Sequence, residues 1–249
     1  MSTLKGKVAF VTGGTRGMGK AIVERLAKEG AMVAFTYVNS NDSARKIVSE
    51  IVQAGGKALA IKADGAIKGA VANAIEEATA TFEKIDILVN NAAVSVNGPI
   101  ETANERTEAY NAQIDVNIRS VAEAVRTAQK YMPDGGRIIN IASVGGIRIG
   151  GAGMSDYIAT KAAVSAYTRG LAWDLAPRKI TVNSVEPGAT ETDMLINADK
   201  AIRQHLMNSI PLKRFGLPEE IAGLVNFLAG DEAGYITGSS FKIDGGITA

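Results

Sequence analysis

Short apolar runs, most of them rich in β-branched residues, recur along the chain and alternate with longer segments of helical periodicity. The runs that predict strands are 7–12, 32–37, 57–63, 86–92, 136–143, 180–188 and 239–244. Apolar positions spaced by three and four residues predict helices at 18–28, 42–53, 66–82, 105–131, 155–175 and 218–228. Strands that alternate with helices are typical of βαβ units and a mostly parallel sheet.

This alternation predicts an α/β fold with a doubly wound, mostly parallel seven-stranded sheet and helices on both faces. No linker-like stretch divides the chain, so we expect a single domain over residues 1–249. Residues 190–215 follow the sixth predicted strand and show no strand pattern. We expect them to form a small helical lobe over the cleft, where substrate binds.

Charge and composition exclude several classes of function. Lys and Arg number 27 against 26 Asp and Glu, and the basic residues are not clustered, which argues against nucleic-acid and membrane partners. The chain has no cysteine and one histidine, His205, so we expect no metal site. His205 has no motif around it and is predicted to be a surface or packing residue. The absence of cysteine and of a signal-peptide pattern predicts a cytoplasmic protein.

The sequence "TGGTRGMG" at 12–19 joins the first predicted strand to the first predicted helix. In that place the backbone can approach a pyrophosphate, whose charge the free N–H groups of a helix N-terminus stabilise. The glycines at 13, 17 and 19 differ from the usual G-x-G-x-x-G spacing, and the Lys-Ser/Thr pair of a P-loop is missing. The loop therefore predicts a nucleotide site, with a tight turn as the alternative.

The end of the second predicted strand indicates which nucleotide is bound. An NAD site needs a carboxylate there for the ribose hydroxyls, and residues 36–40 contain none. Arg16, Asn39 and Ser40 can instead bind a 2′-phosphate, which predicts a preference for NADP(H) over NAD(H). The alternative for Arg16 is a solvated loop charge.

Tyr157 and Lys161 are four residues apart and therefore share a helix face. Ser143 ends the preceding predicted strand and Asn117 lies on the helix before it, so the four side chains can meet at the carboxyl edge of the sheet. A free tyrosine titrates near pH ~10, and a nearby ammonium lowers such a pKa by roughly 1–3 units. We therefore expect the pKa of Tyr157 to be lowered toward the pH at which an acid–base catalyst works. Taken singly, Ser143 and Asn117 also fit structural roles, and Asp64 fits a helix N-cap.

Several motifs occur together in a fixed order. They are "TGGTRGMG" (12–19), Asp64, "NNAA" (90–93), Asn117, Ser143, "YIATK" (157–161), "PGATET" (187–192) and "YITGSSFKIDGG" (235–246). Over essentially its whole length the chain resembles the short-chain dehydrogenases/reductases. The resemblance implies a Rossmann fold, hydride transfer between a nicotinamide and a carbonyl or alcohol, and a homotetramer.

The resemblance also implies roles for individual residues. Tyr157 is the general acid or base, Lys161 binds the nicotinamide ribose, Ser143 orients the carbonyl and Asn117 holds a water molecule. The residues expected to bind the cofactor are Gly13, Thr15, Arg16, Gly17, Met18, Gly19, Asn39, Ser40, Asp64, Gly65, Asn90, Ala92, Tyr157, Lys161, Pro187, Gly188, Thr190 and Thr192. Within this set, Asp64 is expected at the adenine, Asn90 and Ala92 near the ribose, and Thr190 and Thr192 at the carboxamide.

Two residues depart from the family pattern: Ala93 replaces a glycine, and Glu186 precedes Pro187 where a neutral residue is usual. A carboxylate at Glu186 can contact substrate or make a structural hydrogen bond. An apolar pocket, and hence an apolar ketone, is expected from residues 94–100, 144–154, Met194, Leu195, Ile196 and Met207.

Two alternatives to the ketone reductase remain open. In a 3-oxoacyl-[acyl-carrier-protein] reductase, arginines on two long helices face an acidic carrier. Arg126 suits that role, but Trp173 occupies the expected place of the second arginine. The other alternative is a non-catalytic nucleotide-binding regulatory protein, which has no need of the four polar residues.

Overall fold

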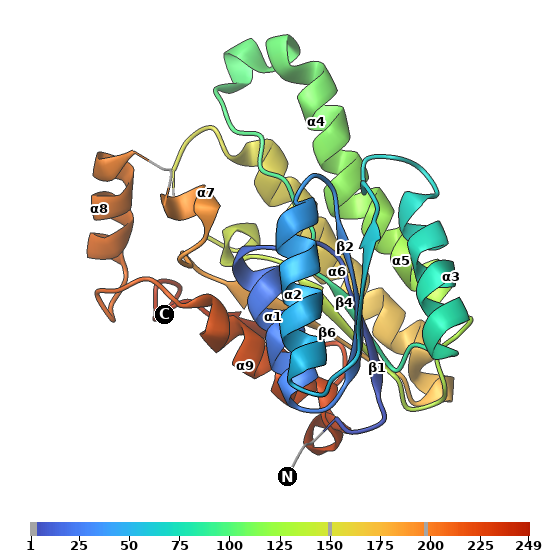
Figure 1. Ribbon diagram of the computed structural model, residues 1–249. Helices are drawn as coiled ribbons and strands as arrows, with labels where there is room; N and C mark the ends of the chain where they lie inside the picture. Colours follow the sequence, from blue (N-terminus) through green and yellow to red (C-terminus); the bar gives the residue numbers. More distant parts are fainter. Residues whose placement is uncertain (1–3, 149–150, 197–198) are drawn as a thin grey trace.

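The computed structural model describes residues 4–148, 151–196 and 199–249, without the side chains of Met194 and Ile202. Its centre is one seven-stranded sheet in the order β3-β2-β1-β4-β5-β6-β7, and every neighbouring pair is parallel. The strands are β1 Val8–Val11, β2 Met32–Tyr37, β3 Ala58–Lys62, β4 Ile87–Asn90, β5 Arg137–Ile141, β6 Thr181–Pro187 and β7 Ser240–Ile243. The predicted doubly wound Rossmann fold is confirmed (Figure 1).

Helices cover both faces of the sheet (Figure 1). On one face lie α1 Gly17–Lys28, α2 Asn41–Gln53 and α9 Pro218–Ala229, and on the other α3 Ala70–Phe82, α5 Ser120–Ala128 and α6 Ser155–Leu175. Alternate residues of β1 supply the two cores: Ala9 and Val11 face α1 and α9, whereas Val8 and Phe10 face α3 and α5. Because both faces are covered, all four residues of β1 are apolar and buried.

The long helix predicted at 105–131 is interrupted. It consists of a 3-10 segment η1 (Ile100–Arg106), α4 (Thr107–Ile114), a π-helical turn η2 (Asp115–Arg119) and α5. A π-helical turn displaces the residues that follow it around the helix axis, and such turns occur often at functional sites. Asn117 lies inside this turn and is buried.

The start of α3 also differs from the prediction, because the helix begins at Ala70 and not at residue 66. The carboxylate of Asp64 accepts the N–H of Ala66, which folds the chain into a local turn. Gly69, directly before the helix, has a left-handed backbone with φ of 86°. The residues between β3 and α3 therefore form a loop at the carboxyl edge of the sheet.

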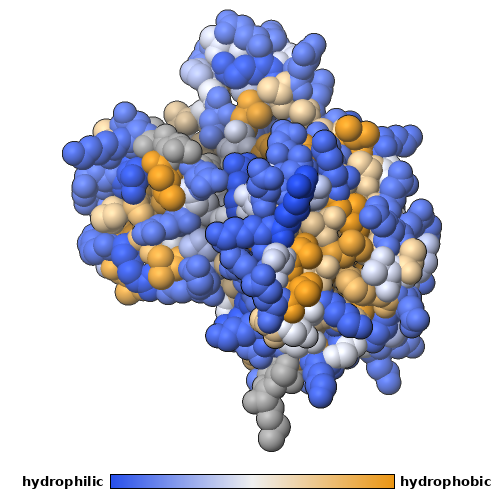
Figure 2. Space-filling view, viewed as in Figure 1, coloured by the Kyte–Doolittle hydropathy of each residue, from blue (hydrophilic) through white to orange (hydrophobic). Residues whose placement is uncertain are grey.

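The predicted helical lobe contains α7 (Asp193–Ile196) and α8 (Lys200–Ser209) around a small core of Leu195, Ile210 and Phe215. Positions 197 and 198 of the predicted lobe lie outside the described residues. The ends of α4 and α8 stand out from the sheet body as two separate hydrophilic projections (Figures 1 and 2). The remaining short 3-10 segments are η3 Val144–Gly146, η4 Ala176–Arg178 and η5 Asp231–Ala233. Within the described part of the chain, no helix combines the length and apolar character needed to span a membrane.

Candidate active site

The glycine loop lies at the carboxyl end of β1, where the strand order reverses between β2 and β4. Gly13 and Gly17 have positive φ values of 70° and 50°, which favour glycine. A Cβ on Gly19 would collide with the carbonyl of Gly13, so the loop turns too tightly for any side chain there. The first turn of α1 carries no acidic residue, which leaves the partial positive charge of its N-terminus free for an anion.

Asn91 holds the glycine loop against β4. Its side-chain amide donates to the carbonyls of Thr12 (2.9 Å) and Gly13 (3.0 Å). In return, the N–H groups of Asn91 and Ala92 both donate to the hydroxyl of Thr12, at 2.9 and 3.0 Å. Asn91 had no assigned role in the sequence analysis, although it stands inside the "NNAA" motif. The structure gives it the task of fixing the shape of the loop.

The residues predicted to read the 2′-phosphate lie beside this loop. Arg16 is 74% exposed in its side chain, and its Nη1 lies 3.4 Å from Oδ2 of Asp193 at the start of α7. Asn39 is exposed and Ser40 is half-buried, directly before α2. A surface ion pair of this kind is weak and is easily exchanged for a stronger anionic partner. The guanidinium is therefore available to a ligand.

Helix α6 carries two of the predicted catalytic residues, Tyr157 and Lys161, and contacts the third, Asn117, through Thr160. The ammonium of Lys161 donates to the carbonyl of Ile141 at the end of β5 (2.8 Å). The amide of Asn117 donates to the hydroxyl of Thr160 (3.0 Å), and that hydroxyl donates to the carbonyl of Tyr157 (2.7 Å). Thr160 was missed by sequence reasoning, and its only signal is its place in "YIATK".

Ser143 lies two residues after β5, on the same edge of the sheet. Its hydroxyl oxygen accepts the N–H of Gly145 at 3.0 Å, which starts the short segment η3. A Cβ on Gly146 would lie 3.2 Å from Cα of Ala162, so η3 packs closely on α6 beside Lys161. The structure thus places all four predicted catalytic residues at one edge.

The expected lowering of the pKa of Tyr157 is wrong for the cofactor-free protein. Burial raises the pKa of the Tyr157 phenol to about 12 and lowers the pKa of the Lys161 ammonium to about 8. Desolvation disfavours the charged form of each group and is the cause of both shifts. Tyr157 therefore holds its proton throughout the physiological range.

Three further residues predicted to bind the cofactor have contacts within the fold. Asn90 is buried and donates to Asn140 Oδ1 (2.8 Å), so its side chain is used inside the fold. Thr190 donates to the carbonyl of Gly188 (3.1 Å). The methyl group of Thr192 lies beside Gly17, 3.1 Å from where a Cβ on that glycine would lie. The roles of Thr15, Met18, Asp64, Gly65, Ala92 and Pro187 toward a cofactor stay predictions.

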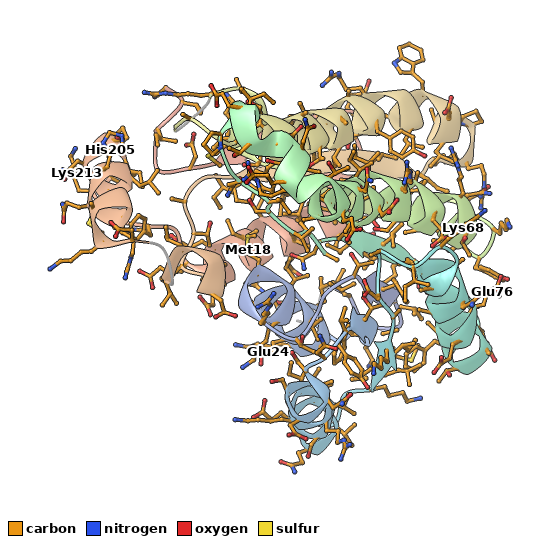
Figure 3. The ribbon with its side chains drawn as sticks, turned by 90° about the horizontal axis from the view of Figure 1, so that it is seen from above. Met18, Glu24, Lys68, Glu76, His205 and Lys213 are labelled. Carbon is orange, nitrogen blue, oxygen red and sulfur yellow. The ribbon has the colours of Figure 1, made fainter. Side chains whose placement is uncertain are left out.

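Figure 3 shows His205 on α8, away from Met18 at the start of α1. His205 is exposed on the lobe, in agreement with the expected surface role. Within the described ranges, no group of three or more acidic, histidine or cysteine side chains is placed to hold a metal ion.

The two departures from the family pattern have structural explanations. Glu186 is 1% exposed, and its Oε1 accepts the hydroxyl of Ser165 on α6 at 2.8 Å. Its other oxygen is buried without a partner among the described residues. Glu186 thus ties β6 to α6. Ala93 is not among the non-glycine residues with positive φ, so the added methyl group causes no backbone strain.

A cavity of about 570 Å³ opens next to the start of α6. Its lining residues are Asn97, Gly98, Pro99, Ile100, Glu101, Ala152, Gly153, Ser155 and Asp156. Leu195 and Met207, which were expected to line an apolar pocket, pack in the small core of the lobe, and their contact with a substrate stays a prediction. Positions 149 and 150 and the side chain of Met194, also named for that pocket, lie outside the described residues.

Comparison with known proteins supports this geometry. A family model described as Enoyl-(Acyl carrier protein) reductase matches residues 13–248. A 3-oxoacyl-[acyl-carrier-protein] reductase of Synechocystis sp. is 40% identical, and the alignment covers 99% of each chain. The solved short-chain dehydrogenase/reductase of Serratia marcescens is 47% identical with a TM-score of 0.94, covering 99% of this chain and 100% of the other.

A short-chain dehydrogenase of Burkholderia cenocepacia, solved in complex with NADP, is 42% identical with a TM-score of 0.95 and the same two coverages, 99% and 100%. The likeness extends over nearly the full length of each of these proteins, so it includes the glycine loop and the Tyr157–Lys161 helix together. This chain belongs to the short-chain dehydrogenase/reductase family of oxidoreductases.

Proposed function

We propose that the protein is an NADP(H)-dependent carbonyl reductase that transfers hydride from the nicotinamide to an apolar ketone. The observation that carries the proposal is the meeting of Asn117, Ser143, Tyr157 and Lys161 beside the glycine loop at one sheet edge. The loop supplies a site for the pyrophosphate, and the four polar residues supply proton transfer and polarisation of the carbonyl.

The residues of the cleft fit NADP(H). The free N–H groups at the start of α1 suit the pyrophosphate, and Arg16 is exposed next to a strand end without carboxylates. The Burkholderia relative was solved with NADP. When bound, the cofactor supplies the hydride, and the protein supplies binding, orientation and the proton. Lys161 is the cation available to the nicotinamide ribose.

The protonated phenol of Tyr157 is the form that reduction of a carbonyl requires. Since burial raises its pKa to about 12, the phenol carries the proton that a newly formed alkoxide must receive. Ser143 uses its oxygen as an acceptor for Gly145, which leaves its hydroxyl hydrogen free to donate to the substrate carbonyl. Both amide hydrogens of Asn117 are used by protein acceptors, and only its oxygen has capacity left for the expected water.

The 3-oxoacyl-[acyl-carrier-protein] reductase activity of the Synechocystis relative supports a second candidate for this chain. Arg126 on α5 is exposed, as an acidic carrier would require. Trp173, 85% exposed on α6, offers no charge at the expected second position. Glu101 and Asp156 border the cavity and would repel an acidic carrier at this entrance. We therefore favour a free, neutral ketone.

We also propose that the enzyme is a cytoplasmic homotetramer. Trp173 and Tyr235 are among the most exposed large hydrophobic side chains of the described residues, and burial of such groups stabilises association. The absence of cysteine suits a reducing compartment. Light scattering after size-exclusion chromatography tests the assembly: a mass near four chains is expected, and a monomer contradicts it.

The test of the activity is the oxidation of NADPH, with NADH in parallel, in the presence of 2-heptanone, 2,3-hexanedione or acetoacetyl-coenzyme A. We expect turnover of a ketone with NADPH preferred. Preference for the thioester promotes the carrier-protein alternative. NADPH binding without turnover of any of the three compounds contradicts the proposal and favours the regulatory alternative.

A further inference from the structure

A stripe of polar side chains runs along one face of the helix that leads to Asn117. Arg106, Tyr110, Gln113 and Asn117 are spaced by four, three and four residues, so they face the same side. A helix that packs on a domain normally presents apolar residues at these positions. Here the only buried residue of α4 is Gln113, which is polar.

The stripe binds the backbone of residues 94–99, which we call the wall segment. Asn117 accepts the N–H of Val94 and donates to its carbonyl, both at 2.9 Å. Gln113 accepts the N–H of Val96 through Oε1 at 2.6 Å. Arg106 donates to the carbonyl of Pro99 at 2.9 Å. The wall segment has no regular secondary structure, so these bonds from the helix fix its place.

The wall segment borders the cavity beside the catalytic helix. Asn97, Gly98 and Pro99 line the cavity, and the N–H of Gly98 donates to the carbonyl of Gly153 at 2.8 Å, four residues before Tyr157. A Cβ on Gly98 would collide with the guanidinium of Arg106, which shows how closely the stripe and the segment pack. A shift of the segment at Val96 therefore changes the cavity beside Ser155 and Asp156, in the first turn of the helix that carries Tyr157.

Gln113 is not an ordinary core residue. Its side chain is 0% exposed, yet Nε2 is buried without a hydrogen-bond partner among the residues that the structure describes. An apolar side chain of the same size would fill this space without burying an unpaired donor. What such an apolar residue lacks is the side-chain oxygen of Gln113, which accepts the N–H of Val96.

We propose that Gln113 is a positioning residue that sets the wall segment against the start of α6, which carries Tyr157, and thereby determines how well a carbonyl substrate binds. This inference rests on the proposed function. Asn117 binds the wall segment at Val94, next to the catalytic residues. Gln113, one helical turn earlier, binds it at Val96, closer to the cavity. The predicted effect is on substrate binding, because Gln113 itself touches none of the four catalytic side chains in a hydrogen bond that the structure shows.

The test compares Gln113→Met, which keeps the size and removes the acceptor, with Gln113→Glu, which retains an acceptor oxygen in either protonation state. Hydrogen exchange of the Val94 and Val96 amides is followed by NMR, and KM and kcat are measured with 2,3-hexanedione and saturating NADPH. In Gln113→Met we expect Val96 to exchange at least about tenfold faster and KM to rise about tenfold, with kcat within about threefold of wild type. Gln113→Glu restores both values to within about threefold.

Asn183→Leu is the matched control. Asn183 is also a buried amide that binds loop backbone, at Ile236 and Ser239, but it lies on β6 away from the wall segment. Asn183→Leu should lower Tm by about as much as Gln113→Met does, and it should leave both the exchange of Val96 and KM unchanged. Unchanged exchange of Val96 in Gln113→Met, or faster exchange with an unchanged KM, overturns the inference. If the wild type reduces none of the ketones, the proposed function fails, while the exchange of Val96 still decides whether Gln113 holds the segment.

Discussion

The two loops that border the proposed active site are held in place in different ways. The glycine loop is shaped first by its own glycines: Gly13 and Gly17 have positive φ, and Gly19 touches Gly13 so closely that no side chain fits. Asn91 then fixes this loop against β4. The wall segment contains one such glycine, Gly98, and its place depends mainly on side chains of the helix that follows it, those of Asn117, Gln113 and Arg106. In the proposed function the first loop binds the cofactor and the second borders the substrate.

Because the two loops are held differently, we expect them to respond differently to substitution. A loop whose glycines fit only one conformation tolerates little change, which suits a ligand that stays the same. A segment held by a few side-chain bonds can be moved by a single substitution on the neighbouring helix, which suits a change of substrate. The comparison predicts that variants of the glycine loop lose cofactor and that variants of the stripe alter KM for the carbonyl compound.

Among the substitutions that test the comparison of the two loops, the largest expected effect is that of Gly19→Ala. Its methyl group would collide with the carbonyl of Gly13, so the loop must open and NADPH binding should fall by at least about 100-fold, measured by the fluorescence of bound NADPH. Gly223→Ala is the control, because a Cβ at this helical glycine of α9 meets nothing within 4 Å. Equal affinity for NADPH in both variants would contradict the role given to the loop.

The next effect is that of Asn91→Leu, which removes the side-chain bonds to the carbonyls of Thr12 and Gly13. We expect a loss of about 2–3 kcal/mol in the free energy of unfolding and roughly tenfold weaker NADPH binding, with KM for the ketone little changed. Gln113→Met should give the reverse pattern. If the two variants affect the same parameter, the two loops are not independent.

A pH effect on stability is expected at Lys161, whose buried ammonium donates to the carbonyl of Ile141 at the end of β5. Its pKa is about 8 in the folded protein and near 10.5 when unfolded, so the unfolded state binds more protons between these values. The free energy of unfolding should therefore rise by about 2 kcal/mol from pH 8 to 9.5 in the wild type. In Lys161→Met this rise should be absent, as measured by urea unfolding. A rise of the same size in the variant would exclude Lys161 as its source.

The smallest effect concerns Arg16. Arg16→Ala should weaken NADPH about tenfold and NADH by less than about threefold, because only NADPH carries the 2′-phosphate. Asp193→Asn removes the ion-pair partner of Arg16 and should leave NADPH binding equal or slightly tighter. Equal losses for both cofactors in Arg16→Ala would show that this residue does not read the phosphate.

Features formed by residues that are neighbours in the sequence could be predicted, whereas features formed by residues far apart in the sequence could not. The strands, the glycine loop and the Tyr157–Lys161 pair are local patterns and were predicted. The bonds of Asn91 to Thr12 and of Gln113 to Val96 join segments 79 and 17 residues apart, and no local pattern indicates them. The π-helical turn at 115–119 was likewise not predicted, because the periodicity of 105–131 indicates one continuous helix.

The pKa of Tyr157 shows the same limit in energetic terms. Its spacing to Lys161 predicts attraction between opposite charges, and that reasoning gives a lowered pKa. Burial depends on the whole fold, and in the structure it dominates both residues. The identities of the site residues could be predicted from the sequence, whereas the direction in which the pKa of Tyr157 shifts could not.

The most direct test of the central claim is the turnover and NADPH affinity of Tyr157→Phe, with Tyr167→Phe on the same helix as the control. The change removes the proton donor and leaves the glycine loop intact. We predict that the dissociation constant of NADPH stays within about threefold of wild type and that kcat falls by about 10²–10⁴-fold, while Tyr167→Phe stays near wild type. Turnover by Tyr157→Phe within a few-fold of wild type would contradict the assignment of Tyr157 as the acid of a carbonyl reductase.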